Sequence, residues 1–293
     1  MTDASELQAS LLSARNADGG WPFRQGASWT EPTALALLAL QSANDSGDAR
    51  ARAASWLAKR QSADGGWPPC LSVPTSTWVT SLALLALAQE PPYSRCSSGG
   101  LRWLSSHIYP DLPVFQSLLR RSFGFSPSRA PGSSPWFPGT AGWVIPTSLS
   151  ILALSAWSRQ TALANLPETV SRAQNYLLSR RCSDGGWNHG GSRQRSENSV
   201  SYAETTGLAL LALANYSSAS PNLTPALRLA QEFLRQPDSP EGHAWLLMGL
   251  AAHGQKIAAP PFAQRLRTNR DLALQLIAFH ALRGHNPFLQ PVF

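Results

Sequence analysis

Three glutamates stand at matching places in a repeated pattern of this sequence, and they are its first candidates for acid–base chemistry. Each lies two residues ahead of a polar residue that opens a run of small and leucine residues: Glu31 before Thr33, Glu204 before Thr206 and Glu241 before His243. Matching places in stacked repeats meet at one end of the assembly, where mutual repulsion raises a carboxyl pKa. The alternative is structural, because the free amides and dipole of a helix N-terminus favour a carboxylate in the first turn.

Aromatic residues keep the same register. Trp29, Trp143 and Tyr202 each lie four residues before the corresponding threonine, and Trp78 takes the place of the glutamate in the second repeat, as Ile145 does in the third. Aromatic faces at the mouth of a chamber would contact a polyene or a cation. Equally, they would fill the junction between a loop and a helix as ordinary packing.

Helices of two kinds are expected to position these residues. Residues 50–61 place Ala53, Trp56 and Leu57 on one stripe, which predicts an amphipathic outer helix. The motif Asp-Gly-Gly-Trp follows such helices three times, at residues 18–21, 64–67 and 184–187, and its glycines end them. The following runs are apolar on every side, which predicts inner helices buried on all faces, at 33–40, 81–87, 148–154 and 207–213.

We therefore expect one all-α domain over residues 1–293, built from six helical hairpins. The units span about 1–42, 48–90, 96–157, 168–215, 224–253 and 260–284, and the last two are weaker copies. In the third unit Trp136 is expected to hold the place of the motif tryptophan. An insertion at about 109–135 makes this unit longer, and insertions in repeat proteins usually form a loop on one face.

Composition excludes several classes. The net charge of +7 comes mostly from scattered arginines, which favours a solvated outer surface over a nucleic-acid site. No apolar run is long enough to span a membrane, and residues 1–6 do not resemble a signal peptide. Three irregularly placed cysteines argue against a disulfide framework, so a reducing, cytoplasmic location is expected.

Residues 52–67, from Arg-Ala-Ala-Ser-Trp-Leu to Asp-Gly-Gly-Trp, resemble the QW repeat of squalene-hopene and oxidosqualene cyclases. Two other copies match less fully, with Asn16 and Arg181-Cys182 where glutamine is expected. This repeat belongs to the superfamily of terpenoid cyclases and protein prenyltransferases. The resemblance implies an (α/α)6 toroid, with amphipathic outer helices and apolar inner helices around an apolar chamber.

The resemblance also implies a reaction. Cyclases of this kind protonate an alkene or epoxide with the middle acid of an Asp-x-Asp-Asp motif, which this chain lacks, as it lacks Asp-Asp-x-x-Asp. Alignment on Thr33-Ala34 puts Glu31 at the place of that acid, with Glu204 and Glu241 equivalent in their own repeats. The prenyltransferase zinc pattern is also missing, since Cys182, Asp184 and His189 lack its spacing. No metal and no cofactor are expected.

Three functions remain open at this point. The chain is expected to bind or cyclise an isoprenoid or another apolar small molecule, with Glu31, Glu204 or Glu241 as acid and Trp29, Trp78, Trp143 and Tyr202 as contacts. Alternatively, it is a non-catalytic lipid-binding or protein-interaction toroid, or a prenyltransferase-type subunit with a partner protein. The insertion carries Phe115 and Arg120-Arg121, which suits peripheral contact with a membrane.

Overall fold

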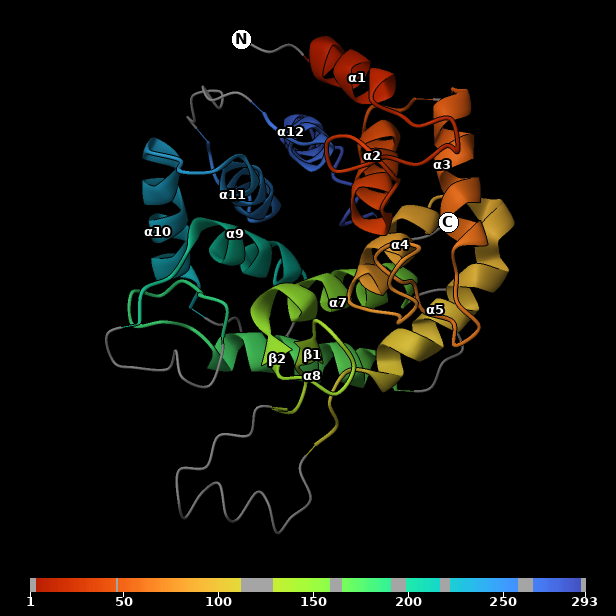
Figure 1. Ribbon diagram of the computed structural model, residues 1–293. Coiled ribbons are helices and arrows are strands. Elements are labelled where there is room, and N and C mark those ends of the chain that lie inside the picture. Colours follow the sequence, from red (N-terminus) through yellow and green to blue (C-terminus); the bar gives the residue numbers. More distant parts are fainter. Residues whose placement is uncertain are drawn as a thin grey trace.

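Six inner helices form a closed ring (Figure 1). The computed structural model describes residues 4–45, 47–111, 129–158, 165–190, 199–216, 222–257 and 266–290. The inner helices are α2 (Thr30–Ser42), α4 (Val79–Leu87), α7 (Val144–Trp157), α9 (Ala203–Ala212), α11 (Pro240–Ala252) and α12 (Asn269–Ala281). Each packs against the next, and α12 returns to α2. The expected all-α toroid is confirmed.

Outer helices surround the ring: α1 (Ala4–Ser13), α3 (Asp48–Lys59), α5 (Ser94–Ser106), α8 (Leu166–Ser179) and α10 (Thr224–Arg235). Helices α3, α5, α8 and α10 each pack on the inner helix that precedes them in the chain, whereas α1 packs on α12. The first outer helix thus covers the last inner one. Most of the outer part of the sixth hairpin, residues 258–265, lies outside the described residues.

Hydrogen bonds close the ring between the two ends of the chain. The backbone N–H of Asn269 donates to the carbonyl of Phe23 at 2.7 Å, and its side-chain amide donates to the carbonyl of Pro22 at 2.9 Å. These bonds tie the first turn of α12 to the loop that leads into α2. Because Asn269 is buried, they are shielded from water.

The Asp-Gly-Gly-Trp turns brace each hairpin. The indole N–H groups of Trp21, Trp67 and Trp187 each donate at 2.7 Å to a carbonyl near the end of the preceding outer helix. Their backbone N–H groups donate to threonine hydroxyls on the inner helices, at distances of 2.9 to 3.0 Å, namely Thr33, Thr80 and Thr206. The repeated threonine is therefore a brace between turn and helix.

The aspartate of the turn joins one hairpin to the next. The carboxylate of Asp18 accepts a hydrogen bond from the indole of Trp56 on the following outer helix, at 2.9 Å. Asp64 accepts from Trp103 in the same way, at 3.0 Å. In the third copy Asp184 instead accepts from the backbone and hydroxyl of Ser201. The motif thus fixes the spacing of neighbouring hairpins.

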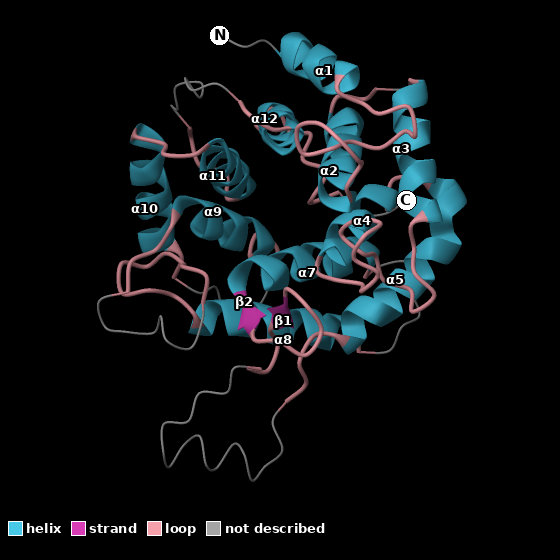
Figure 2. Ribbon diagram, viewed as in Figure 1, coloured by secondary structure: helices cyan, strands magenta, loops and turns pink. Residues whose placement is uncertain are grey.

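The third repeat departs from the sequence interpretation. Ser134, not Trp136, donates its backbone N–H to Thr147 at 2.8 Å, and so takes the place of the motif tryptophan. Strands β1 (Ser134–Pro135) and β2 (Gly142–Trp143) pair antiparallel beside α7, and Figure 2 shows them in magenta. A 3-10 turn, η1 (Pro91–Tyr93), precedes α5.

The membrane prediction falls largely on residues 112–128 of the insertion, which lie outside the described part of the chain. Among the described residues, no helix has both the length and the apolar character needed to cross a bilayer.

Candidate active site

The inner helices present two layers of side chains to the centre of the ring. The upper layer comes from residues at the N-terminal ends of the inner helices, Glu31, Trp78, Ile145, Glu204, Glu241 and Arg270. The lower layer comes from residues one helical turn further on, Leu35, Leu82, Leu149, Leu208, Trp245 and Leu274. Residues four apart on a helix lie on one face, so the two layers stack. All of these residues except Glu204 line one cavity, together with Trp136.

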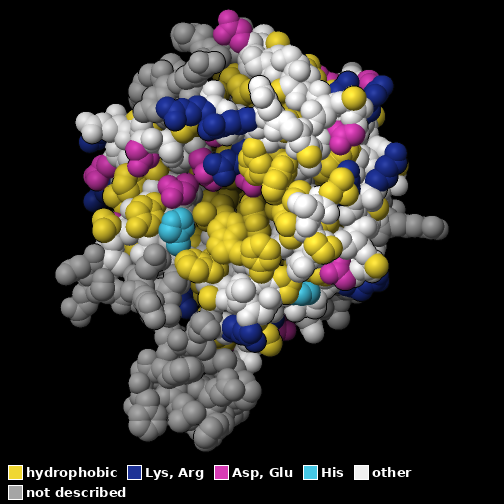
Figure 3. All heavy atoms as spheres, viewed as in Figure 1, with side chains coloured by type: hydrophobic (Ala, Val, Ile, Leu, Met, Phe, Trp, Pro, Cys, Tyr) yellow, Lys and Arg dark blue, Asp and Glu magenta, His cyan; other side chains and the backbone are white. Residues whose placement is uncertain are grey.

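This cavity has a volume of about 220 Å³, and its wall is mainly apolar. Five leucines and Trp245 form its lower part, while the charged groups are confined to the upper layer, beside Trp78 and Ile145. Figure 3 shows hydrophobic side chains gathered in a hollow at the centre of this face, with acidic and basic side chains along its upper edge. The site therefore combines an apolar interior with charged groups at its rim.

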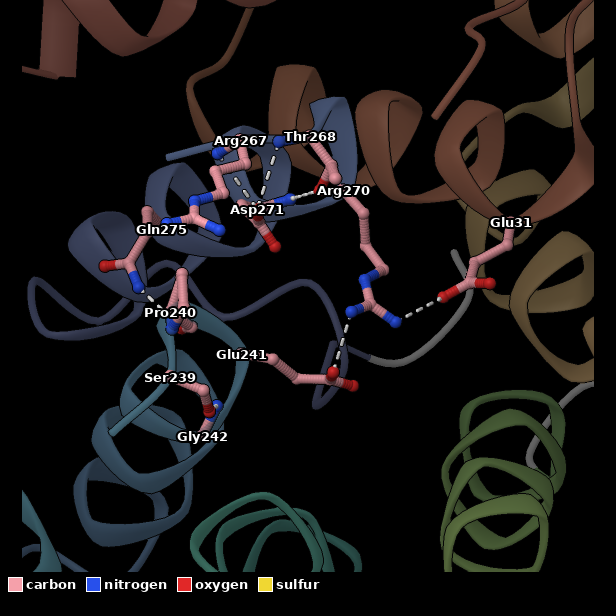
Figure 4. Close-up of polar contacts among 10 residues, drawn as sticks. All are labelled: Glu31, Ser239, Pro240, Glu241, Gly242, Arg267, Thr268, Arg270, Asp271 and Gln275. Carbon is pink, nitrogen blue, oxygen red and sulfur yellow. Dashed lines mark hydrogen bonds and ion pairs between the residues drawn. The ribbon is translucent and has the colours of Figure 1, made fainter. Parts of the chain in front are cut away.

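Two glutamates share one arginine at this rim (Figure 4). The Nη2 atom of Arg270 lies 2.8 Å from Oε2 of Glu241, and Nη1 lies 3.5 Å from Oε1 of Glu31. The exposed fractions of the three side chains are 30% for Arg270, 28% for Glu241 and 15% for Glu31. Arg270 therefore pairs most closely with Glu241, and Glu31 is the least solvated of the three.

Burial controls the proton affinity of these acids. It raises the pKa of Glu31 to about 7, with a further contribution from the charge of Glu241, against the opposing effect of Arg270. Burial also raises the pKa of Glu241, although Arg270 opposes the change, and the nearby charge of Glu204 adds to it. The pKa of Arg270 is raised because both glutamates favour its charged form more than burial disfavours it. Glu31 can thus carry a proton near neutral pH.

The first turn of α12 shows why Arg270 points into the chamber. Thr268 and Asp271 form a capping box: the Thr268 hydroxyl accepts the N–H of Asp271 at 3.0 Å, and the Asp271 carboxylate accepts the N–H of Thr268 at 3.0 Å. These bonds satisfy the amides of Thr268 and Asp271, and the Arg270 side chain, which can only donate, takes no part in the cap. A cation in the first turn opposes the helix dipole, so its placement depends on the two glutamates of neighbouring helices.

Glu241 is positioned in a similar way. The Ser239 hydroxyl caps α11 by accepting the N–H of Gly242 at 3.0 Å. The side-chain amide of Gln275 on α12 donates to the carbonyl of Pro240 at 2.7 Å, which ties the start of α11 to α12. With the helix end capped by serine, the Glu241 carboxylate is available to Arg270.

The structure brings together three of the seven predicted site residues on the cavity wall: Glu31, Glu241 and Trp78. Trp78 packs edge-on against Trp136, with ring centroids 4.8 Å apart. Glu204 is absent from the wall, although it lies close enough to Glu241 to affect its pKa.

Trp29, Trp143 and Tyr202 lie immediately before α2, α7 and α9, and none of them lines the cavity. Trp29 packs edge-on against Phe23 with centroids 5.5 Å apart, and Tyr202 lies beside His189 and is 44% exposed. These positions fit packing at the junction of loop and helix. A role for the three in ligand contact stays a prediction.

Sequence reasoning missed Arg270, Trp245 and the contribution of Trp136 to the wall. Arg270 holds the same register as Glu31, two residues ahead of Leu272. That leucine stands where the other repeats have a polar residue, threonine in four of them and His243 in the fifth. The bond from the Trp78 N–H to the Trp136 carbonyl, at 3.2 Å, brings the Trp136 loop to the start of α4. Nothing in the local sequence signals this contact.

Comparison with known proteins relates the chain to others through its fold. No family model and no curated protein matches the sequence. MstE from Scytonema, a type II terpene cyclase solved with its substrate geranylgeranyl dihydroxybenzoate, matches with a TM-score of 0.57 and 19% identity, over 99% of this chain and 80% of that chain. The family 8 glycosyl hydrolase Cel10, an endoglucanase from Klebsiella pneumoniae, matches with a TM-score of 0.62 and 15% identity, over 94% and 98%.

An α-amylase from Clostridium perfringens matches with a TM-score of 0.65 and 9% identity, over 95% of this chain and 97% of that chain. At such identities the similarity shows the fold alone. The same α/α toroid thus occurs in type II terpene cyclases and in glycosidases, and the chemistry of this chain must be argued from its own site.

Proposed function

We propose that this protein binds an isoprenoid in the central chamber and cyclises it, with Glu31 as the general acid. The observation that carries this proposal is a buried carboxyl group with a pKa of about 7 at the rim of an apolar cavity. A general acid works best when its pKa lies near the working pH. Glu31 meets this condition, and the mainly apolar wall of the cavity beneath it disfavours competing water.

The lining of the cavity favours a hydrocarbon over a sugar. Five leucines, one isoleucine and three tryptophans line it, and its charged side chains are Glu31, Glu241 and Arg270. A sugar buried here would lose the hydrogen bonds of its hydroxyl groups to water and find few partners in exchange. The matching glycosidases share the fold of this chain, but the wall of its cavity gives no reason to expect that it binds a sugar.

The reaction would start with transfer of the Glu31 proton to the isoprenoid. If the acceptor is an epoxide oxygen, the C–O bond opens as the O–H bond forms, and the carbon centre left positive is attacked by the next double bond. Ring formation moves the positive charge along the chain until a proton is lost to a base. A carboxylic acid with a pKa of about 7 is a weak acid, so an epoxide oxygen suits it better than a bare alkene carbon.

Aromatic rings stand where the positive charge would develop. Trp78, Trp136 and Trp245 line the cavity below and beside Glu31. The negative faces of such rings stabilise a cation by about 1–2 kcal/mol when water is excluded. The ion pair between Arg270 and Glu241 would hold the rim in place. The positive charge of Arg270 also compensates the negative charge of the Glu241 carboxylate.

A non-catalytic role in binding is the second candidate, and the size of the chamber favours it. Ligand pockets usually enclose about 300–1,000 Å³. The volume of about 220 Å³ is smaller, so the chamber holds only the end of a long isoprenoid chain. Binding of that end requires no room for ring formation, so the small volume favours a binding role.

A product assay separates the two candidates. Purified protein is incubated with isoprenoids of ten to twenty carbons, with and without a terminal epoxide, and the extracts are analysed by gas chromatography and mass spectrometry. Binding is followed in parallel by quenching of tryptophan fluorescence. We expect cyclic product from the wild type, and Glu31→Gln to bind ligand but lose product formation. Glu204→Gln, whose side chain is absent from the cavity wall, is the matched control and should retain activity.

Binding without product in the wild type would support the non-catalytic candidate. Equal product formation by the wild type and Glu31→Gln would remove Glu31 from the reaction. Contact with a membrane surface stays a further prediction, and deletion of residues 112–128 with a liposome sedimentation assay tests it.

A further inference from the structure

The C-terminal ends of two inner helices border a second hollow, away from the charged rim of the chamber. Helix α7 packs against both α8 and α9 (Figure 1), and the hollow lies where the last turns of α7 and α9 meet the first half of α8. Its volume of about 800 Å³ falls within the usual range of ligand pockets, about 300–1,000 Å³. The described walls of the hollow and the chamber have no residue in common, so the two are separate sites.

The wall of this hollow combines apolar side chains with neutral polar groups. Leu152 of α7, Leu211 of α9 and Phe288 of the segment after α12 contribute buried apolar side chains. The polar side chains are hydroxyls and amides, from Ser155, Ser158, Ser171, Gln174, Asn215 and Tyr216. The described part of the wall contains no Asp, Glu, Lys, Arg or His. The hollow therefore suits a neutral ligand with an apolar body.

Gln174 of α8 is the one buried polar residue in the described part of this wall. It is 6% exposed, and its side-chain amide has no hydrogen-bond partner among the residues that the structure describes. Burial of an amide without a hydrogen bond is unfavourable, so a group inside the hollow is expected to pair with it. Because an amide both donates and accepts, the matching group is one that does both, as a carboxamide or a hydroxyl does.

Comparison of the repeats shows that a hairpin does not need a glutamine at this position. Gln174 lies three residues before the leucine of the outer-helix stripe, as Ala54 does in α3 and Leu101 does in α5. Ala54 and Leu101 are buried apolar side chains, 0% and 2% exposed. Helix α10 also has a glutamine there, but Gln231 is exposed and donates to Gln255 at 3.4 Å. The buried amide is thus a feature of α8 that packing of the hairpin does not explain.

We infer that this hollow is a second binding site, for a small neutral molecule with an apolar body and a carboxamide or hydroxyl group that pairs with Gln174. The inference goes beyond the proposed function and does not depend on it, because the chamber is a separate site. The apolar body would lie against Leu152, Leu211 and Phe288, out of contact with water. A charged ligand is disfavoured, since it would lose hydration and gain no opposite charge from the described wall.

Probes with one hydrocarbon chain and different head groups test this chemistry: octanamide, 1-octanol and octanoate. Isothermal titration calorimetry of the full-length protein gives their dissociation constants and the number of bound equivalents. We expect octanamide or 1-octanol to bind about tenfold or more tightly than octanoate, and the comparison of these two tells a carboxamide site from a hydroxyl site. Gln174→Leu should weaken the preferred neutral probe about tenfold, the effect of losing about one hydrogen bond. Gln231→Leu is the matched control and should leave binding unchanged.

Ser171→Trp tests the location of the site by filling it. Ser171 is exposed on α8 and lines the hollow, so a tryptophan there should block the hollow without disturbing the core. We expect this variant to lose one bound equivalent of the preferred probe. Ser179→Trp is the matched control, because Ser179 is exposed on the same helix and is absent from the wall of the hollow. It should keep every equivalent.

Equal binding of the neutral probes by the wild type, Gln174→Leu and Ser171→Trp would overturn the inference, with thermal melting to show that each variant is folded. A wild type that prefers octanoate, or that binds neither neutral probe at millimolar concentration, would also overturn it. If Gln174→Leu does not fold, the equivalents bound by Ser171→Trp decide. None of these results bears on cyclisation in the chamber, which the product assay tests separately.

Discussion

Arg270, near the start of the last inner helix, lies 3.5 Å from Glu31, near the start of the first. The contact therefore joins residues from the two ends of the chain, at the seam where the ring closes. It is also the contact that opposes the effect of burial on Glu31. Closure of the fold and the proton affinity of the candidate acid are thus linked through one side chain.

Removing Arg270 should raise the pKa of Glu31 above its value of about 7, because the arginine favours the charged carboxylate. Glu241→Gln should lower this pKa, since it removes a neighbouring negative charge and leaves Arg270 free to pair with Glu31. Carbon-13 NMR titration of the glutamate carboxyls measures both, with Glu31→Gln to assign the signal. Arg270→Lys keeps the charge and is the control. Shifts of the same sign in Arg270→Gln and Glu241→Gln would contradict this electrostatic account.

Glu31 should make the free energy of unfolding fall as pH rises. Its pKa is about 7 in the folded protein against 4.5 for an unperturbed glutamate, so its stabilising contribution is fully present below pH 4.5 and is lost as pH rises through 7. The loss amounts to about 3 kcal/mol. Glu31→Gln imitates the protonated form, so it should match the wild type at pH 4 and exceed it at pH 8. Urea denaturation at a series of pH values tests this, and a variant less stable than the wild type at pH 8 would contradict it.

Gly207 allows α9 and α11 to approach closely, beside the residue that lines the chamber on α11. A Cβ atom at Gly207 would lie 2.4 Å from the backbone carbonyl carbon of Trp245 and 2.4 Å from the backbone nitrogen of Leu246. Helix propensity alone predicts that Gly207→Ala stabilises by about 1 kcal/mol. The backbone clash predicts the reverse, a loss of about 1–3 kcal/mol.

Thermal and urea unfolding of Gly207→Ala decide between these opposite signs. Gly254→Ala is the control, because a Cβ atom added there would meet nothing within 4 Å. The only cost expected for this variant is the backbone strain of alanine at a φ of +65°, in the left-handed region. A gain of stability in Gly207→Ala would show that the two helices have room to separate.

The indole of Trp56 should stabilise the junction of the first two hairpins through its bond to Asp18. Trp56→Phe keeps most of the aromatic packing but removes the donor to a carboxylate, at a cost of about 1.5–3 kcal/mol. Trp103→Phe removes the equivalent bond to Asp64, so it should lose a similar amount. A double-mutant cycle of Trp56→Phe with Asp18→Asn measures the coupling, and additive losses would mean that the bond contributes nothing.

The sequence predicted the fold well because the evidence for it is local and repeated. Stripes such as Ala53, Trp56 and Leu57, and the glycine turns that follow, mark each hairpin without reference to the rest of the chain. The register of the repeats also puts Glu31, Trp78 and Glu241 at one level of the ring, and all three line one cavity. The repeat pattern predicts the position of a residue wherever that residue has the same role as the equivalent residues of the other hairpins.

The remainder of the site does not repeat, which is why the sequence did not reveal it. Arg270 occupies a repeat in which Leu272 stands where the other repeats carry a threonine or a histidine, and Trp136 is brought to the cavity by a backbone bond to Trp78. Ser134 takes the place of a motif tryptophan through its backbone N–H, and a backbone donor is available to almost any residue type. Its identity therefore carries no sequence signal.

The most direct test of the central claim is the pH dependence of turnover. If Glu31 donates the proton, the rate of product formation with an epoxidised isoprenoid should be constant at low pH and fall above about pH 7, where the acid loses its proton. Glu31→Gln should reduce the rate about 10²- to 10⁴-fold while ligand binding persists. A rate that rises through pH 7, or a Glu31→Gln variant as active as the wild type, would contradict the account.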